Sequence, residues 1–346
     1  MKTRYIRFII DADYGTDSLR GVCEGRGAFW KGVTEMSSIL VTGASGMIGQ
    51  YLTSSLLHKK HRVYAVDSKP NDFIGSDPNY SFVQCDITDK KTVSEIMDNN
   101  HIDVVVHLAN SVDNDIDPLI TDAEIRKSKA TDKYIYAAAA KSGVGCFVLL
   151  STTDVYGLQK GREPIRETIA EKAFTYYSEM KLTSEKLMEK AFKKSDIIEV
   201  VARAAPVYDA EHTDNLHAHV YDNKENVGYV FGDGDYGYTF CCVFNLIDFI
   251  NGIISVPQGR YGGVYNVCDS RQTNAHEIIE YEKERHRIGA VIQRSPGSEK
   301  AMLFNKGKMR ADYRYFDPTL TYNNWLFDNT RAKRIAPMRW NLGNTK

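Results

Sequence analysis

Two side chains one helical turn apart, those of Tyr177 and Lys181, are the best placed in the sequence for acid–base chemistry. A free phenol has a pKa near 10, so it is a poor base at neutral pH. A lysine ammonium on the same helix face favours the phenolate and lowers that pKa. A phenol tuned in this way can take a proton from a substrate hydroxyl and give it back.

The spacing by itself is not specific to catalysis. The chain has 21 tyrosines, and Tyr156 with Lys160 repeats the same spacing. Tyr177 can equally be a core aromatic residue beside a lysine that reaches water with its charged end. What favours catalysis is the order of the other motifs along the chain.

A hydroxyl group stands shortly before this helix, at the end of an apolar run. Residues 146–150 predict a buried strand, and Thr152 lies just after it. Apolar residues recur at helical spacing over residues 172–193, which predicts a helix that carries Tyr177 and Lys181 on one face. We expect Thr152 to hold the same substrate oxygen as Tyr177.

A glycine-rich turn indicates a nucleotide-binding loop. Residues 39–41 predict a short buried strand, which is followed by Gly43, Gly46 and Gly49 and then by a helix. Such a turn lets the backbone approach a pyrophosphate, and the helix directs its free N–H groups and positive end at the charge. The alternative is a tight strand-to-helix turn without a ligand. The predicted ligand is a dinucleotide.

A carboxylate ends the second predicted strand, at residues 62–66. Asp67 stands roughly 20 residues beyond the glycine turn, where a carboxylate accepts hydrogen bonds from a ribose 2′-OH and repels a 2′-phosphate. This favours NAD over NADP, although the nearby Lys69 softens the preference. The alternative is an ordinary aspartate of a strand-end turn.

A nicotinamide cofactor would complete the chemistry of the phenol. Its oxidised ring is positively charged, so it joins Lys181 in favouring the phenolate of Tyr177. Lowering the phenol pKa to about 7 takes roughly 4 kcal/mol, which two cations can supply in a partly dry cleft. Tyr177 then exchanges a proton with a substrate hydroxyl while the hydride passes to the cofactor.

Two further strand ends are expected near the cofactor. After a predicted strand at residues 80–84, Asp86 and Ile87 can meet the edge and face of an adenine, or Asp86 can cap the next helix. After a predicted strand at residues 103–106, the small Ala109 can line the cofactor path. His107 at the same strand end is expected to be packed and not to act as an acid or base.

Predicted strands alternate with helices, including a helix at residues 118–141. This alternation predicts an α/β fold with a doubly wound parallel sheet, in which ligands bind at the carboxyl ends of the strands. We expect an N-terminal extension of unknown role (residues 1–35) and a Rossmann domain (residues 36–205). Residues 206–346 are expected to form mainly a smaller C-terminal substrate-binding lobe, with residues at about 240–268 returning to the Rossmann domain.

The composition is that of a soluble globular protein. The 346 residues are 42% hydrophobic, and 44 Lys and Arg residues face 45 Asp and Glu residues for a net charge of -1. This balance offers no electrostatic surface for nucleic acid or for a membrane. Six scattered cysteines show no metal-type pairing and are expected to be reduced thiols in a cytoplasm. The spacing of His212, His217 and His219 fits no metal site, and we predict none.

Together these motifs resemble the extended short-chain dehydrogenase/reductases, specifically the NAD-dependent epimerase/dehydratase family of nucleotide-sugar enzymes. The resemblance runs from about residue 36 to the C-terminus. It is carried by the turn at residues 42–49, Asp67, Asp86-Ile87, His107-Leu108-Ala109, residues 151–157 and 164–167, and Tyr177 with Lys181.

The resemblance implies a site and an assembly. Thr152, Tyr177 and Lys181 would be catalytic, NAD the cofactor, and the protein a cytoplasmic homodimer that associates through the helices holding Tyr134 and Tyr177. The residues that would bind NAD are Gly43, Ser45, Gly46, Met47, Ile48, Gly49, Asp67, Asp86, Ile87, Leu108, Ala109, Tyr177 and Lys181.

The chain departs from the family at four places. Pro206 stands where the family usually has an asparagine, and it has no amide to offer a substrate. Tyr238 stands where an arginine often binds the nucleotide diphosphate, and a phenol cannot replace a bidentate cation. Ser128 replaces the helix asparagine thought to support the catalytic tyrosine. The run at residues 152–154 is Thr-Thr-Asp and not the Thr-Asp-Glu of the dehydratases, which disfavours a 4,6-dehydratase.

The leading expectation is an NAD-dependent epimerase that transiently oxidises a hydroxyl of a nucleotide sugar. One alternative is a dehydrogenase or reductase of a non-nucleotide sugar or small carbonyl, which the changes at Pro206 and Tyr238 would explain. An alternative of another class is a non-catalytic NAD-sensing protein on the same fold, which the Ser128 change favours. This protein would bind NAD without turning over any sugar.

Overall fold

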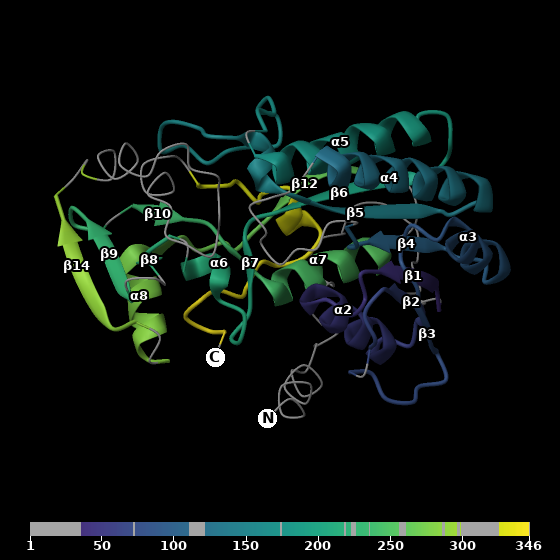
Figure 1. The fold of residues 1–346 in the computed structure, drawn as a ribbon, viewed down its shortest axis with the longest axis horizontal. Coiled ribbons are helices and arrows are strands. Elements are labelled where there is room, and N and C mark those ends of the chain that lie inside the picture. The colour runs from purple at the N-terminus through teal and green to yellow at the C-terminus, as the bar shows by residue number, and fades with distance from the viewer. Residues whose placement is uncertain are drawn as a thin grey trace, which may run out of the picture.

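A seven-stranded parallel sheet forms the centre of the molecule (Figure 1). The structure is a computed structural model and describes residues 36–345, apart from residues 72, 111–121, 174, 218, 223–225, 235, 256–260, 286–287, 296–297 and 299–324. The strand order is β12-β6-β5-β4-β1-β2-β3. These strands are, in that order, Gly263–Val267, Ile198–Ala204, Cys146–Thr152, Val104–His107, Ser38–Thr42, Arg62–Asp67 and Tyr80–Gln84. The predicted doubly wound α/β fold is confirmed.

Helices cover both faces of this sheet, so its strands are buried on both sides. On one face lie α2 (Met47–His58) and α7 (Val243–Ser255), and on the other lie α3 (Lys90–Asn99), α4 (Asp122–Ser142) and α5 (Tyr176–Phe192). Strands that are apolar along their whole length, such as the valines of β4, suit this double burial. The result is one apolar core on each side of the sheet.

The order of the strands creates a reversal point between β1 and β4. The strands β2 and β3 lie on one side of β1, whereas β4, β5 and β6 lie on the other. Thr42 at the end of β1 pairs with His107 at the end of β4. Ligands of doubly wound sheets bind at this point, outside the carboxyl ends of the strands. The glycine turn and the segment that follows His107 therefore meet where a ligand is expected.

The predicted strands are present, with ends within two residues of the expected ones. The predicted start of the helix at residue 172 is wrong, because α5 begins at Tyr176. Thr175 caps the helix: its Oγ1 accepts from the N–H of Ser178 at 3.0 Å, and the Ser178 hydroxyl accepts from the Thr175 N–H at 3.0 Å. This reciprocal pair satisfies two donors that would otherwise be unpaired, and so sets the start of the helix. Of the predicted helix at residues 118–141, the first four residues lie outside the described part.

A second region follows β6 and lies beside the sheet, at the left of Figure 1. It contains the sheet β14-β9-β8 and the short pairs β11–β7 and β10–β13. Its elements are β7 (Val207–Tyr208), α6 (Asp214–His217), β8 (Tyr221–Asp222), β9 (Val227–Phe231), β10 (Gly237–Tyr238), β11 (Cys241–Cys242), β13 (Thr273–Asn274), α8 (Ala275–Lys283) and β14 (Ala290–Arg294). One core cluster joins Ile39 of the sheet to Ile278 of α8, so the two regions share an apolar interior.

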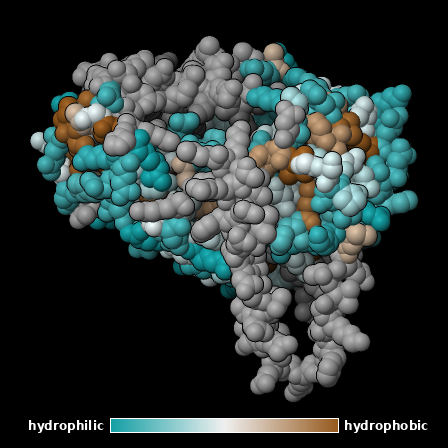
Figure 2. Space-filling model, turned by 90° about the horizontal axis from the view of Figure 1, so that it is seen from below, coloured by the Kyte–Doolittle hydropathy of each residue, from teal (hydrophilic) through white to brown (hydrophobic). Residues whose placement is uncertain are grey.

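The outer strand of this region, β14, is exposed along its whole length. Val291 and Ile292 are 39% and 37% exposed, and Figure 2 shows apolar atoms at this end of the molecule.

No helix in the described ranges is both long enough and apolar enough to cross a lipid bilayer.

Candidate active site

The glycine turn packs against the strand end beside it. Gly43 has φ +74°, and a Cβ there would lie 2.8 Å from the backbone nitrogen of Ala109. A Cβ on Gly49 would lie 2.2 Å from the carbonyl oxygen of Gly43. Only glycine fits either position, because any side chain would overlap with backbone. The turn is therefore packed closely against the segment that follows β4.

The N-terminus of α2 is open to an anion. The helix begins at Met47, with Gly46 as its N-cap, no side chain caps it, and its first turn holds no acidic residue. Unpaired N–H groups and the positive end of the helix dipole therefore face out of the turn. Ser45 and Ile48 flank this end, as the sequence predicted for a pyrophosphate site.

Asp67 lies against the glycine turn. Its Oδ2 accepts from the Ser45 N–H at 2.9 Å, and its Oδ1 accepts from the Lys69 N–H at 2.9 Å. The Ser45 hydroxyl donates to the Lys69 carbonyl at 3.0 Å. Asp67 therefore forms the strand-end turn of the alternative interpretation, and it does so on the cofactor side of the sheet.

Asp86 and Ile87 follow β3, as predicted, but Asp86 does not cap the next helix. Asp89 is the N-cap of α3, and its side chain accepts from the Thr92 N–H. Asp86 instead accepts from the N–H and hydroxyl of Thr88 and lies 3.5 Å from Lys127 Nζ. Ile87 is 7% exposed, and it lines a hollow of about 180 Å³ between this loop and α4.

The segment after β4 is fixed to the end of β1. The Leu108 N–H donates to the Thr42 carbonyl at 3.2 Å, and the Ala109 N–H donates to Thr42 Oγ1 at 3.3 Å. His107 is buried, with its ring 5.9 Å from that of Phe147. His107 is packed, as predicted.

Tyr177 and Lys181 lie together at the end of β5. Lys181 is 6% exposed, and its Nζ donates to the carbonyl of Leu150 at 3.0 Å. The same Nζ lies 5.8 Å from the centre of the half-buried Tyr177 ring. The hydrogen bond to β5 therefore fixes the ammonium under the phenol at the carboxyl edge of the sheet.

Thr152 ends β5 beside this pair. Its side chain is buried, and its Oγ1 accepts from the Asp154 N–H at 3.2 Å, which starts the short helix η1 (Thr153–Tyr156). The turn places Asp154 close enough for its charge to act on Tyr177. The structure thus brings the three predicted catalytic residues to one strand end.

The protein alone does not make the phenol acidic. Burial and then the charge of Asp154 raise the pKa of Tyr177 above its ordinary value. Burial lowers the pKa of Lys181 to about 8, against the charges of Asp132 and Glu185, which raise it. From the sequence, a lower pKa was expected for Tyr177 because of two cations, Lys181 and the oxidised nicotinamide ring. The chain supplies the lysine, and the burial of the phenol, which raises the pKa, was not considered.

The sequence model of the NAD dependent epimerase/dehydratase family matches residues 39–268, which include this whole arrangement. The chain belongs to this family. Membership makes it an enzyme that uses NAD.

Relatives of this chain are similar over most of its length. It is 22% identical over 352 residues to the probable UDP-arabinose 4-epimerase 3 of Arabidopsis thaliana, covering 90% of this chain and 82% of that one. It is 26% identical over 266 residues to the uncharacterized UDP-glucose epimerase YtcB of Bacillus subtilis, covering 70% and 79%. The crystal structure of WbmH from Bordetella bronchiseptica in complex with NAD+ superposes with a TM-score of 0.66 at 19% identity, covering 90% and 96%.

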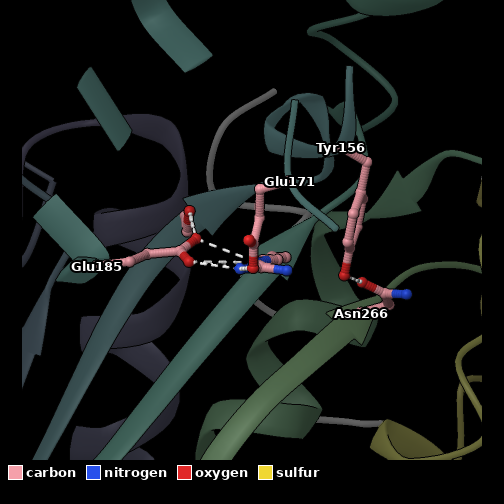
Figure 3. A network of polar contacts seen from close by, with 6 residues as sticks. Tyr156, Glu171, Glu185 and Asn266 are labelled. Carbon is pink, nitrogen blue, oxygen red and sulfur yellow. Dashed lines mark hydrogen bonds and ion pairs between the residues drawn. The ribbon is translucent and has the colours of Figure 1, made fainter. Parts of the chain in front are cut away.

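A buried ion-pair cluster lies one turn beyond Lys181. Arg203 on β6 donates from Nη2 to Glu185 at 2.6 Å and to Glu171 at 2.7 Å. Figure 3 shows both carboxylates converging on one side chain, with Tyr156 donating to Asn266 at 2.6 Å beside them. Glu185 also accepts from the Ser151 hydroxyl, next to Thr152. The cluster ties α5 to the strand ends on which the site depends.

The sequence analysis did not select Glu185 or Arg203 as functional residues. A signal was present, because Glu185 is a charged residue four positions after Lys181 on an otherwise apolar helix face. Arg203 is 2% exposed, which an arginine tolerates only when its charge is paired. The partner of Glu185 lies on another element, so spacing within the helix could not identify it.

Three of the departures from the family have polar groups that bond within the protein. Tyr238 is 1% exposed, and its hydroxyl donates to the His219 carbonyl at 3.4 Å. The Pro206 carbonyl accepts from the Cys241 N–H at 3.0 Å. Ser128 donates to Asn110 Oδ1 at 3.4 Å. Tyr238 therefore belongs to the interior and does not present its hydroxyl to a ligand.

The histidines after β7 have protein partners. His212 Nδ1 lies 3.0 Å from the Asp209 carboxylate, and His219 Nδ1 donates to the Asn215 carbonyl at 2.8 Å. The side chain of His217 lies outside the described part. Within the described ranges, no group of three or more His, Cys, Asp or Glu side chains is arranged to hold a metal ion.

Proposed function

We propose that the chain is an NAD-dependent epimerase that acts on a carbohydrate hydroxyl of a nucleotide sugar by transient hydride transfer. The observation that carries this proposal is the Lys181 ammonium, which bonds to Leu150 at the end of β5 and lies 5.8 Å from the centre of the Tyr177 ring. The UDP-sugar epimerases among the relatives support the substrate class.

The described residues fit a dinucleotide at the reversal point of the sheet. The glycine turn has no room for a Cβ at Gly43 or Gly49, and the uncapped N-terminus of α2 favours a pyrophosphate. Asp67 lies beside this turn for a ribose, and the hollow next to Ile87 and Asp86 has room for an adenine. The residues that would hold the pyrophosphate and the nicotinamide end are Ser45, Gly46, Met47, Ile48, Leu108 and Ala109.

The bound NAD would supply a hydride acceptor that later returns the hydride, with a positive charge when oxidised. Tyr177 takes the proton of the substrate hydroxyl as the hydride leaves the same carbon. Thr152 holds that oxygen from the end of β5. Lys181 keeps a positive charge under the phenol, and this charge offsets the cost of burying a phenolate. The same side chain binds the cofactor ribose.

Epimerisation uses the same residues in reverse. When the hydride returns to the other face of the carbonyl carbon, Tyr177 gives its proton back to the oxygen and the configuration is inverted. Alternatively, the carbonyl acidifies the neighbouring carbon, which loses and regains a proton on opposite faces before the hydride returns. We place the sugar between the carboxyl edge of the sheet and residues 206–346.

The buried Tyr238 favours a second candidate function. Because its hydroxyl bonds within the protein and Pro206 has no amide, the usual partners of a nucleotide diphosphate are missing at these two positions. A dehydrogenase or reductase of a non-nucleotide sugar or small carbonyl needs no such partners.

The experiment compares Tyr177→Phe with Tyr176→Phe. Tyr176 precedes the candidate residue on the same helix and is 44% exposed, so its variant removes a phenol hydroxyl outside the site. Both proteins and the wild type are incubated with NAD and a panel of UDP-sugars and free sugars, and products are followed by mass and by NMR stereochemistry. We expect Tyr177→Phe to lower turnover by about 10²–10⁴-fold and Tyr176→Phe to leave it unchanged.

Binding in the same proteins separates the candidates. NAD affinity should stay nearly the same in Tyr177→Phe, and NAD should bind more tightly than NADP because of Asp67. Unchanged turnover in Tyr177→Phe would remove this residue from the mechanism. Conversion of free sugars alone would select the dehydrogenase, whereas NAD binding without turnover of any UDP-sugar would contradict the proposed epimerase.

We also propose a cytoplasmic homodimer that associates through α4 and α5, on the basis of the family resemblance. These two helices pack side by side on one face of the sheet (Figure 1). Light scattering of the purified protein tests the dimer, and fractionation of the producing cell tests the compartment.

A further inference from the structure

A small chamber lies behind the proposed catalytic lysine, Lys181. It is lined by side chains from four elements, among them His107, Asn110, Ser128, Asp132 and Lys181. Its volume of about 10 Å³ is close to the smallest space that holds a single water molecule. The chamber is polar, so a water in it would have partners on several sides.

Two charged side chains face this chamber. Asp132 on α4 and Lys181 on α5 are both 6% exposed. The hydrogen bond of the lysine goes to Leu150, at 3.0 Å. The Asp132 carboxylate lies 3.6 Å from His107 Nε2. The contacts of Lys181 with Leu150 and of Asp132 with His107 do not join the two charges. Lys181 and Asp132 therefore interact across the chamber that both of them line.

His107 orients the carboxylate. Thr42 Oγ1 accepts from the Ala109 N–H at 3.3 Å, so its own proton is available for His107 Nδ1 at 2.7 Å. When Nδ1 accepts, the proton of the imidazole is on Nε2, which faces Asp132. Thr42, at the end of β1, thus orients His107 so that its Nε2–H faces Asp132.

One donor in the chamber has no partner. The Nδ2 of Asn110 is buried and makes no hydrogen bond to any described residue, whereas its Oδ1 accepts from Ser128 at 3.4 Å. A buried amide without a partner is destabilising, and an ordered water removes that cost. A water here would accept from Asn110 or Lys181 and donate to Asp132.

We propose that the chamber holds one ordered water that links Lys181 to Asp132 and Asn110, and that Asp132 is a positioning residue for Lys181. Through this water the carboxylate keeps the lysine charged under Tyr177. The inference deepens the proposed function and depends on it for its catalytic meaning, because the charge of Lys181 is what offsets the phenolate.

The other charges around Lys181 do not serve this purpose. They are Tyr177 and Glu185 on α5, Asp154 on η1, His107 on β4 and Arg203 on β6. Glu185 is held by Arg203 at 2.6 Å, so its charge is largely compensated. Burial lowers the pKa of Lys181 to about 8, and Asp132 is the first of the groups that raise it. Asp132 is therefore the carboxylate whose removal changes the lysine most.

The test measures the titration of Lys181 directly in the full chain. The Cε resonance of ¹³C-labelled lysine is followed over pH in the wild type, in Asp132→Asn and in the control Asp248→Asn, and is assigned with Lys181→Arg. Asp248 is also a buried acid, on α7, where it pairs with Arg339 at 3.5 Å. We expect Asp132→Asn to lower the pKa of Lys181 by about one unit and Asp248→Asn to leave it unchanged.

Activity adds a second readout. With an active substrate, the alkaline limb of the kcat/KM profile should move to lower pH by the same amount in Asp132→Asn. An unchanged Lys181 titration in Asp132→Asn would overturn the proposal, whatever the activity. A shifted titration in a protein that turns over no sugar would support the Asp132 link while the proposed function fails.

A second variant keeps the proposal testable if Asp132→Asn does not fold. Ser128→Val fills the chamber with methyl groups and leaves both charges in place. Loss of the water should lower the pKa of Lys181, because the ammonium loses a hydrogen-bond partner. An unchanged titration of Lys181 in Ser128→Val would contradict the proposed water.

Discussion

Two buried acids in different regions of the molecule are held in opposite ways. Glu185, on α5, is paired with Arg203 at 2.6 Å. Asp269, just after β12, accepts from three neutral donors among the described residues: the Cys242 N–H and Asn245 Nδ2 at 2.7 Å and the Tyr208 hydroxyl at 2.9 Å. The hydrogen bonds and charge of Glu185 raise the pKa of Arg203, although burial opposes them.

The difference shows what a cation does for a buried acid. Burial raises the pKa of Asp269 to about 7, even though three hydrogen bonds lower it. Three neutral donors therefore do not offset the burial of this carboxyl. The region around Asp269 should respond to pH near neutrality.

The largest effect is expected from Arg203→Met. This change leaves Glu185 buried without its cation, which costs about 3–5 kcal/mol of unfolding free energy. Urea unfolding at pH 7 measures the loss. The matched control is Arg166→Met, since Arg166 is 73% exposed in its pair with Asp328 and should cost less than about 1 kcal/mol. Equal losses in the two variants would contradict the role of burial.

Asp269→Asn should change how stability depends on pH. The native carboxyl keeps its proton up to about pH 7, whereas in the unfolded chain it releases the proton near pH 4. The native state binds more protons between these values, so this acid makes stability fall as the pH rises from 4 to 7, by on the order of 2–4 kcal/mol. Unfolding of the variant between pH 5 and pH 8 should show a smaller fall than the wild type. An identical pH dependence would contradict the assignment.

Tyr156→Phe tests a neutral hydrogen bond beside the charged cluster. The Tyr156 hydroxyl donates to Asn266 Oδ1 at 2.6 Å, and both residues are fully buried. The variant leaves this oxygen unpaired, which should cost about 1–3 kcal/mol at any pH between 5 and 8. A loss that varied with pH would mean that the charged cluster had been disturbed as well.

The smallest effect is expected from Glu171→Gln. Glu171 also accepts from Arg203 Nη2, at 2.7 Å, but its side chain is 34% exposed. Water can replace this contact, and the amide oxygen of glutamine can still accept, so the loss should stay below about 1 kcal/mol. A loss as large as that of Arg203→Met would show that Glu171 carries the pairing instead of Glu185.

Much of the fold followed from the sequence because it depends on local pattern. Apolar runs such as that of β4 could be located from the order of residues alone, and the glycine turn could be placed between a strand and a helix. The start of α5 was wrong by four residues, because the capping by Thr175 and Ser178 outweighed an apolar periodicity that began earlier.

The site was predictable only in part, for a physical reason. The grouping of Thr152, Tyr177 and Lys181 at one strand end follows from topology, which the sequence indicates well. The partnership of Glu185 with Arg203 and the burial of Tyr238 depend on contacts between distant elements. The direction of the Tyr177 pKa depends on how deeply the phenol is buried, and spacing carries no such information.

The cap at Thr175 also determines which changes the chain can tolerate. An α-helix turns by about 100° per residue, so a residue added between Thr175 and Lys181 would rotate the lysine away from Leu150 at the end of β5. The loop between η1 and Thr175 lies before the cap and does not set this rotation. Insertions and deletions should therefore accumulate in that loop during evolution, and the six positions after the cap should keep their number.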